Sequence, residues 1–219
     1  FITQPLPIGG VSIIVITVAA LTGTLKIGEA ISGFANSAIW LIVGAFLFSR
    51  GFIKTGLGKR IAYNLIAAFG SSSLRLAYAL ALSDLILAPA TPSNTARVGG
   101  VIMPITTSLA KAFGSEPQDG PRKIGSFLMQ SIYQVNTITS AMFQTSMAGN
   151  TLVAALALQS FGIGITWGDW AMAAIVPGVI ALIIMPYFIY KVYPPEIKDA
   201  REAQQMIKEE LKGLGKMSF

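Results

Sequence analysis

The chain has 219 residues, of which 53% are hydrophobic and only 12% are charged. Soluble domains carry about 25% charged residues, so this composition predicts an integral membrane protein. The net charge is +6, but the basic residues flank apolar runs and do not alternate with aromatic residues, which argues against a nucleic-acid partner. The sequence has no Cys and no His, which excludes thiol and histidine catalysis, disulfide bonds and the usual zinc sites.

Residues 8–70 are expected to form two scaffold spans followed by an interfacial helix. The spans cover residues 8–25 and 38–49, and an apolar run of about 18 residues is long enough to cross much of a bilayer. The second span leads into residues 50–60, which are basic without any acidic side chain and therefore mark a cytoplasmic boundary. Residues 61–69 are too few to cross, so we expect a helix along the membrane surface, with a simple loop as the alternative.

Residues 74–113 form an apolar segment about twice as long as one span, with basic residues at both ends. Proline and glycine weaken the helix near its midpoint, at the polar sequence Ser93-Asn94-Thr95. Two full spans with a tight turn, or a re-entrant hairpin whose tip ends inside the membrane, both fit this pattern. Non-helical backbone at membrane depth persists only where protein or a water-filled cavity satisfies its polar groups, so we interpret this first break as a binding site.

Residues 124–191 contain a second break. The polar stretch 144–151 interrupts an apolar run that extends from 124 to 163, which predicts a broken helix, and a further span follows. Residues 195–215 are predicted to form an amphipathic cytoplasmic connector helix that begins directly after a pair of prolines.

This topology places all but two of the 16 Lys and Arg residues on one side of the membrane. The exceptions are Lys26 and Arg97. The positive-inside rule therefore supports the predicted number of crossings, but it does not separate the hairpin from two full spans.

The first break has the chemistry of an anion site. Ser93, Asn94 and Thr95 precede a helical run and are typical N-cap residues. A helix that begins inside the membrane presents free N–H groups and the positive end of its dipole, which favours a carboxylate. Asn150 and Thr151 are expected to cap the second half of the broken helix in the same way, so that two helix ends cradle a small anion. The alternative is that these residues are ordinary caps and helix–helix contacts.

Arg97 and Asp84 are the charged residues expected well inside the membrane, where charge is expensive and usually functional. Asp84 lies ten residues before Asn94 and Arg97 lies three residues after it. At about 1.5 Å per residue the two would differ in depth by roughly 10 Å, which argues against a direct ion pair. We expect Arg97 to attract the anion or to replace a bound cation, with hydrogen bonds to backbone carbonyls that lock the hairpin as the alternative.

At these residues the chain resembles the divalent anion/Na⁺ symporter (DASS) family, whose members carry C4-dicarboxylates, 2-oxoglutarate, tartrate and citrate. Ser93-Asn94-Thr95 resembles the family's Ser-Asn-Thr signature at the tip of a re-entrant hairpin. The stretch from Pro92 to Gly100, together with residues 138–150, is similar to the branch of plastid 2-oxoglutarate/malate translocators and their bacterial relatives.

The resemblance implies an all-α integral membrane fold, in which residues 1–219 are the first inverted repeat of a secondary transporter and 74–113 its re-entrant hairpin. It implies a homodimer of the full-length protein that works by an elevator motion, and a second hairpin in a half that this fragment lacks. The substrate-binding residues implied are Ser93, Asn94, Thr95, Arg97, Gly149, Asn150 and Thr151. Ser93, Asn94 and Ser146 would bind Na⁺ only if transport is sodium-coupled, and no other cofactor is implied.

The second break departs from the symporter branch, which carries Thr-Pro-Pro-Asn where this chain has Met147-Ala148-Gly149-Asn150. Together with Arg97, this favours exchange of one dicarboxylate for another. The alternatives are a Na⁺-coupled di- or tricarboxylate symporter and a carrier of inorganic oxyanions. An intramembrane hydrolase that uses Ser93 is disfavoured because no His or second catalytic carboxylate is present. The expected location is a bacterial inner membrane, with the plastid inner envelope as the alternative.

Overall fold

The computed structural model describes residues 6–214, and every named element in that range is helical. The prediction of an all-α fold is therefore confirmed. The chain divides into two compact units, Phe1–Val43 and Gly44–Phe219, which are described separately.

The first unit contains α1 (Ile8–Leu21), α2 (Ile27–Ala30), the short 3₁₀ helix η1 (Ser32–Ala35) and the beginning of α3 (Ser37–Lys54). The helix α1 is apolar on all sides and buries none of its residues. A helix of this kind needs an apolar environment outside its own fold. The predicted first span ends earlier than expected because the turn after Leu21 includes Gly23, whose φ of 70° is left-handed.

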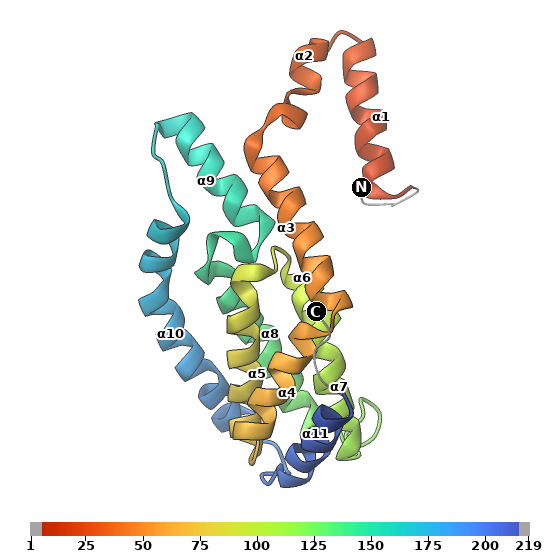
Figure 1. Cartoon of the computed structure of the whole chain (residues 1–219), viewed down its shortest axis with the longest axis vertical. Coiled ribbons are helices and arrows are strands. Elements are labelled where there is room, and N and C mark those ends of the chain that lie inside the picture. The colour runs from red at the N-terminus through yellow and green to blue at the C-terminus, as the bar shows by residue number, and fades with distance from the viewer. Residues whose placement is uncertain (1–5, 215–219) are drawn as a thin grey trace. The chain divides into compact units, whose positions relative to one another are not determined.

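The second unit holds the remaining helices (Figure 1). They are α4 (Leu57–Phe69), α5 (Ser73–Leu87), η2 (Ala88–Ala90), α6 (Asn94–Arg97), the π-helical η3 (Val98–Ile102), α7 (Met103–Ala112), α8 (Gly125–Met142), η4 (Gln144–Ser146), α9 (Ala148–Phe161), α10 (Trp167–Val192) and α11 (Arg201–Gly213). The predicted broken helix is confirmed, since α8 and α9 are separated by the irregular residues around η4.

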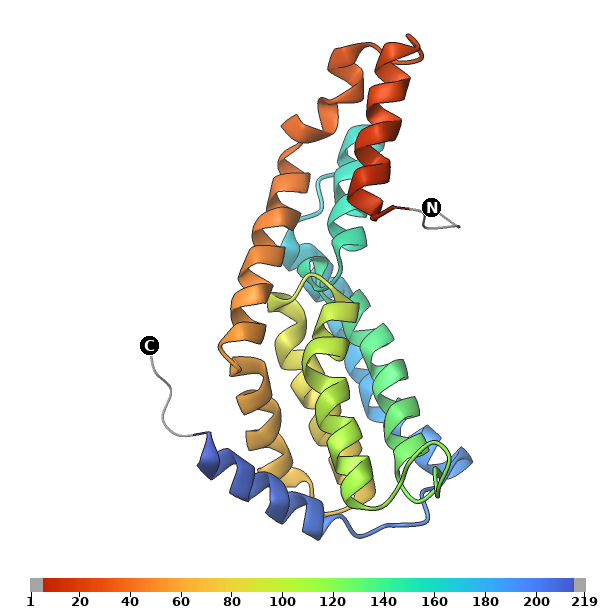
Figure 2. The same ribbon diagram turned by 90° about the vertical axis from the view of Figure 1, so that its right-hand side faces the viewer.

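The helix α5 and the continuous run α6–η3–α7 form the hairpin, and α8 lies beside it (Figure 2). The core shared by the hairpin and α8 contains the fully buried residues Leu80, Ile102, Leu109 and Phe127. The hairpin tip packs on the interruption between α8 and α9, and α9 continues beyond the tip for 14 residues (Figures 1 and 2). The hairpin is therefore shorter than the crossing made by α8 and α9, which favours the re-entrant form over two full spans.

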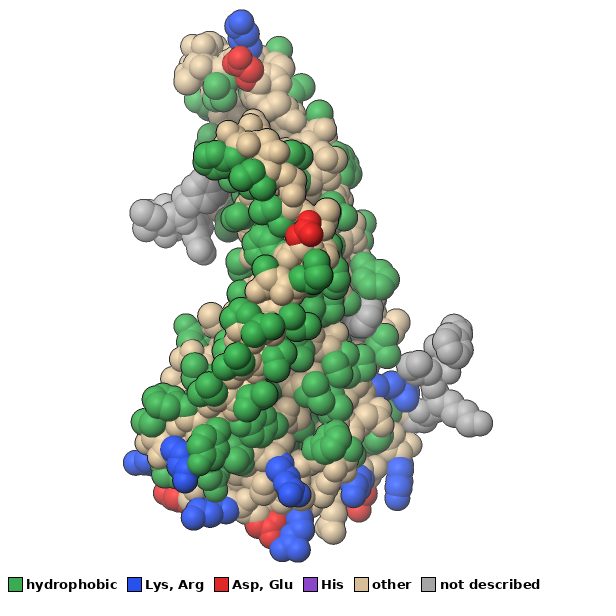
Figure 3. All heavy atoms as spheres, turned by 90° about the vertical axis from the view of Figure 1, so that its left-hand side faces the viewer, with side chains coloured by type: hydrophobic (Ala, Val, Ile, Leu, Met, Phe, Trp, Pro, Cys, Tyr) green, Lys and Arg blue, Asp and Glu red, His purple; other side chains and the backbone are tan. Residues whose placement is uncertain are grey.

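The flanks of the second unit are apolar. Within residues 6–214, two helical stretches are long and apolar enough to cross a membrane, Ser73–Ala90 and Trp167–Val192. Ile8–Leu21 and Ser37–Gly51 are shorter apolar helices. Many apolar side chains of α10 are exposed, which suits contact with lipid. Figure 3 shows hydrophobic side chains on the flank of this unit, with Lys and Arg gathered at the end where α4 and α11 lie. This arrangement agrees with the predicted cytoplasmic side.

The connector differs from the prediction. The helix α11 begins at Arg201 and not directly after the proline pair, because residues 196–200 form a non-helical strap. Backbone hydrogen bonds join this strap to the base of the hairpin and to the start of α8. They are Glu196 N–H to Arg122 O (3.1 Å), Ile197 N–H to Lys123 O (2.9 Å), Ser73 N–H to Lys198 O (3.0 Å) and Ala200 N–H to Ser71 O (3.2 Å). These bonds replace those that a first helical turn would have made.

The helix α11 packs on α4. Ile207 and Ala203 are each 1% exposed and lie in the same core as the residues of α4. The Tyr63 hydroxyl donates a hydrogen bond of 2.5 Å to Glu210. Burial raises the pKa of Tyr63 above its ordinary value, which extends the pH range over which this hydroxyl is a donor. The Gln204 amide donates to the carbonyl of Ala67 at 2.8 Å, which adds a polar link to the apolar contact.

Replacing Ile207 by Ala should lower the free energy of unfolding by about 2–4 kcal/mol, because the substitution leaves a cavity between α11 and α4. The measurement is thermal or denaturant unfolding of the detergent-solubilised protein. Lys208→Ala, on the exposed face of the same helix, is the matched control and should change stability by less than about 0.5 kcal/mol. Equal effects of the two substitutions would contradict the docking of α11 on α4.

Candidate functional site

The two polar breaks lie against each other. The backbone N–H of Ala148 donates to the carbonyl of Pro92 at 3.0 Å. The Thr145 hydroxyl donates to the carbonyl of Pro89 at 2.7 Å. The hairpin tip and the interruption of the broken helix, which are remote in sequence, are therefore adjacent in the fold.

The first break has the predicted N-cap. Ser93 is extended and its hydroxyl accepts a hydrogen bond from the N–H of Ala96 at 3.1 Å. The side-chain oxygen of Asn94 accepts from the N–H of Thr95 at 2.9 Å. No hydrogen bond is found within residues 6–214 for the Asn94 amide nitrogen or for the Thr95 hydroxyl, and Thr95 is exposed. Both groups are available to a ligand.

The second break is capped differently from the prediction. The Asn150 amide donates to the carbonyls of Ser140 (2.7 Å) and Phe143 (3.0 Å). The Thr151 hydroxyl donates to the carbonyl of Gln144 at 3.1 Å. The expectation that Asn150 and Thr151 cap the N-terminus of α9 is therefore wrong. The helix α8 ends inside the protein, and these side chains bond to carbonyls at its end and in the interruption that follows it.

The start of α9 has no side-chain cap, since its N-cap residue is Met147. Gly149 lies in the first turn, where an added Cβ would approach the Met147 methyl group to 3.2 Å. Ser146 is fully buried, and its hydroxyl bonds to the carbonyls of Ser140 (2.6 Å) and Phe143 (2.7 Å). The first turn of α9 therefore presents backbone rather than polar side chains at this break.

Arg97 joins the two breaks. It is fully buried, and its Nε donates to Asp84 Oδ1 at 2.8 Å. Its terminal nitrogens donate to Thr91 O (3.2 Å), Ser146 O (3.1 Å), Thr139 Oγ1 (3.2 Å) and Ser140 Oγ (3.0 Å). A guanidinium has five N–H donors, so all of them are used and none is free for an anion in this conformation.

The ion pair of Arg97 with Asp84 corrects the expectation from helical rise. The estimate treated the chain from Asp84 to Asn94 as a continuous helix. In fact α5 ends at Leu87, and residues 88–93 form a 3₁₀ turn and an extended stretch. Asp84 lies three residues before the end of α5 and Arg97 three residues after the start of α6, so the two side chains meet at the same depth.

Four of the five hydrogen-bond partners of Arg97 were not among the predicted site residues, and Ser146 is the exception. Asp84 Oδ2 accepts a hydrogen bond from the Thr139 hydroxyl and another, at 3.4 Å, from the Asn136 amide. A signal for this network was present in the sequence. A buried Arg needs several acceptors, and the adjacent hydroxyls of Thr139 and Ser140 precede the second break.

The helix α10 also begins beside the second break. The indole N–H of Trp167 donates to the Thr145 hydroxyl at 3.0 Å, and its ring stacks on Phe143 with centroids 5.8 Å apart. The indole N–H of Trp170 donates to the carbonyl of Ala141 at 2.9 Å. These contacts cover one side of the interruption with aromatic rings.

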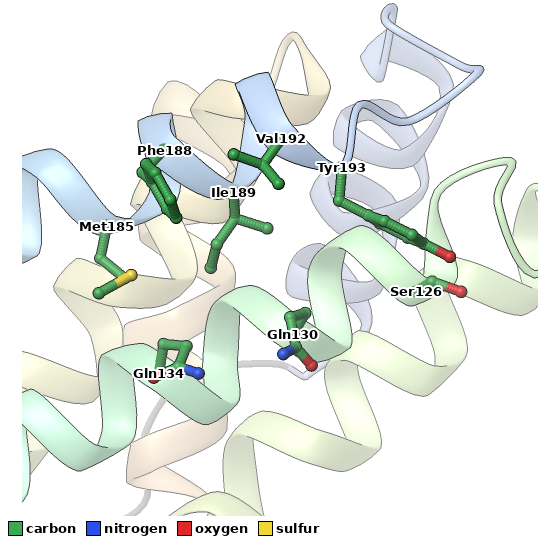
Figure 4. A pocket seen from close by; sticks show the side chains of 8 residues that line it. All are labelled: Ser126, Gln130, Gln134, Met185, Phe188, Ile189, Val192 and Tyr193. Carbon is green, nitrogen blue, oxygen red and sulfur yellow. The ribbon is translucent and has the colours of Figure 1, made fainter.

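A cavity of about 530 Å³ lies between α8 and α10 (Figure 4). Ser126, Gln130 and Gln134 of α8 form its polar wall, and apolar side chains of α10 face them. None of the break residues lines this cavity, so it is separate from the candidate site.

The chain matches the family described as "Sodium:sulfate symporter transmembrane region" over residues 1–219. It is 56% identical over 216 residues to the "Putative malate transporter YflS" of Bacillus subtilis (strain 168), covering 98% of this chain and 45% of that protein. It is 49% identical over 218 residues to "Dicarboxylate transporter 1, chloroplastic" of Spinacia oleracea, covering 99% and 38%. It is 50% identical over 176 residues to "Inner membrane protein YbhI" of Escherichia coli (strain K12), covering 80% and 37%. The chain spans less than half the length of these relatives.

The hydrogen-bond partners predict opposite roles for the two break asparagines. Asn150→Ala should lower the free energy of unfolding by about 1–3 kcal/mol, because the carbonyls of Ser140 and Phe143 each lose one of their hydrogen bonds inside the protein. Asn94→Ala should cost less than about 1 kcal/mol, because the side chain makes one local bond. Thermal unfolding of both detergent-solubilised variants tests this contrast, and a larger loss for Asn94→Ala would contradict it.

Proposed function

The chain belongs to the divalent anion/Na⁺ symporter family, as its sequence predicted, and we propose that it supplies one half of the substrate site of a dicarboxylate carrier. The family is one of transporters, and two of the relatives carry names of transporters and not of enzymes. Two of those relatives are named for malate and dicarboxylates, which supports small dicarboxylate anions as the substrate class.

The observation that carries this proposal is the contact between the two breaks, with unpaired polar groups at the first. Asn94 and Thr95 have free donors beside the start of α6, where a carboxylate is favoured by the helix dipole. We assign direct substrate contact to these two side chains, to the Ser93 turn that presents them and to the backbone at Gly149. We assign an indirect role to Arg97, Asn150 and Thr151, whose hydrogen bonds to backbone carbonyls hold the breaks in place.

We further propose exchange of one dicarboxylate for another. In sodium-coupled carriers, unwound backbone carbonyls at such breaks coordinate Na⁺. Here the guanidinium of Arg97 lies between the carbonyls of Thr91 and Ser146, so a fixed positive charge occupies the junction. This supports transport without a coupling ion. The family description names sodium and sulfate, so Na⁺-coupled symport at Ser93, Asn94 and Ser146, or carriage of an inorganic oxyanion, is the second candidate.

For the whole carrier we propose a homodimer that moves its site by an elevator motion, with two inverted repeats of which this chain is the first. We place it in a bacterial inner membrane, since two of the relatives are bacterial and one is named an inner membrane protein. A plastid inner envelope is the alternative, because other relatives are named chloroplastic.

Exchange predicts that uptake of labelled 2-oxoglutarate by proteoliposomes containing the full-length transporter requires malate inside the vesicles. It also predicts equal rates with external Na⁺ and with N-methylglucamine. Uptake driven by Na⁺ into empty vesicles would instead establish a symporter.

Asn94→Ala and Thr95→Ala should each raise the KM for dicarboxylate about 10-fold or more, because each loses one hydrogen-bond donor to the substrate. The assay is exchange uptake at varied substrate concentration. Asn64→Ala is the matched control, since this exposed amide of α4 bonds only to the Arg60 carbonyl among the described residues. Wild-type KM values for both break variants would remove Asn94 and Thr95 from the site.

A further inference from the structure

We propose that the outer face of α8 lines a water-filled passage, along which a dicarboxylate moves between the two breaks and the end of the protein rich in Lys and Arg. The inference rests on the proposed function and deepens it, because it gives the candidate site a route to the cytoplasm. We call this face the α8 stripe, and it is defined by the polar residues Ser126, Gln130, Tyr133, Gln134 and Thr137.

The α8 stripe follows one side of its helix. Members on successive turns are three or four residues apart, so they lie on the same face. The helix α8 has 18 residues, which gives a length of about 27 Å at about 1.5 Å per residue. It begins at the end rich in Lys and Arg and ends at the second break (Figure 2). The stripe therefore connects the candidate site with the cytoplasmic end.

Several polar groups of the α8 stripe have no partner inside the protein. Gln130, Tyr133 and Thr137 are exposed, and the exposed fraction of Tyr133 is 67%. Within residues 6–214, the Tyr133 hydroxyl and the amides of Gln130 and Gln134 make no hydrogen bond. Unbonded hydroxyl and amide groups are costly against lipid tails, where nothing replaces the hydrogen bonds to water. These side chains therefore indicate water beside α8.

The neighbouring helix α10 shows the opposite pattern. Its outward side chains include Val176, Ile180 and Ile183, which are 64%, 52% and 59% exposed. An apolar face of this kind suits contact with lipid. The helices α8 and α10 lie side by side, so the change from apolar to polar side chains marks a boundary between lipid and a water-filled space.

The cavity between α8 and α10 forms part of this space. Its volume of about 530 Å³ is within the range of about 300–1,000 Å³ that is typical of small-molecule sites. Ser126, Gln130 and Gln134 form its polar wall, and Tyr193 lies at one end of it (Figure 4). The Arg122 guanidinium lies 4.5 Å from the centroid of the Tyr193 ring, so a cation stands beside the cavity.

The passage has the charge that an anion requires. The α8 stripe offers amide N–H and hydroxyl donors, and the sequence has no Asp or Glu between residues 120 and 168. No side chain of α8 therefore repels a dianion. Arg122 raises the local concentration of the dianion at the mouth of the passage. The neutral donors beyond it bind a carboxylate without trapping it, which movement along a pathway requires.

The test places single Cys residues in a version of the full-length transporter without other Cys, in inside-out membrane vesicles. Gln130→Cys and Tyr133→Cys should react with the membrane-impermeant anion methanethiosulfonate ethylsulfonate about 10-fold or more faster than Ile180→Cys and Ile183→Cys. The reason is that the reactive thiolate forms in water and not against lipid. The controls are matched, since both isoleucines are exposed on α10.

Exchange uptake gives the second readout. After reaction, Gln130→Cys should exchange dicarboxylate about 10-fold or more slowly than before, because the bulk and the negative charge of the attached sulfonate oppose a dianion. The same treatment should leave uptake by Ile183→Cys unchanged. If Gln130→Cys does not fold, Thr137→Cys takes its place in both readouts.

Reaction of the stripe Cys residues at the control rate overturns the proposal, and it indicates that lipid or another helix of the carrier covers α8. Fast reaction with unchanged uptake also overturns it, because water then reaches α8 without the substrate passing there. The reaction rates need no substrate, so they decide whether water lines α8 even for a carrier that moves no dicarboxylate. That last outcome refutes the proposed function.

Discussion

The buried guanidinium of Arg97 fixes the geometry on which the candidate site depends. A charge in the protein interior is tolerated only when it is paired and all its donors are bonded. The acceptors here come from α5, the hairpin tip, the end of α8 and the second break. None of these segments can shift against the others without breaking a charge-assisted hydrogen bond in a dry environment, so the tip and the break are held as one unit.

Different forces hold the hairpin at its tip and at its base. Around the breaks the contacts are polar, which suits a protein in lipid, where apolar surfaces gain little by meeting each other. At the end rich in Lys and Arg, the strap of residues 196–200 bonds to the hairpin base, and Ile207 buries apolar surface against α4. There water is present and the hydrophobic effect operates. The hairpin is thus fastened at its tip by hydrogen bonds and at its base by both kinds of contact.

The sequence predicted the features that depend on local pattern. Apolar length predicted where the long apolar helices lie, and the Ser93-Asn94-Thr95 sequence predicted the start of α6. The positions of Lys and Arg along the chain predicted that they gather at one end of the second unit (Figure 3). The errors concern partners that are distant along the chain. Asp84 was separated from Arg97 because a uniform helical rise was assumed through a turn that is not helical. Asn150 was predicted to cap the start of α9, the helix that contains it. Its amide instead bonds to carbonyls at the end of α8, the preceding helix.

The positions of these polar groups suggest how the substrate site works. The second break uses its polar side chains on carbonyls at the end of α8 (Asn150) and in η4 (Thr151), whereas the first break keeps the Asn94 amide and the Thr95 hydroxyl free. The frame and the ligand contacts are thus made by different residues. A frame whose buried polar groups are bonded to one another is costly to take apart. The proposed elevator motion would leave these bonds intact, whereas a local rearrangement of the breaks would have to break them.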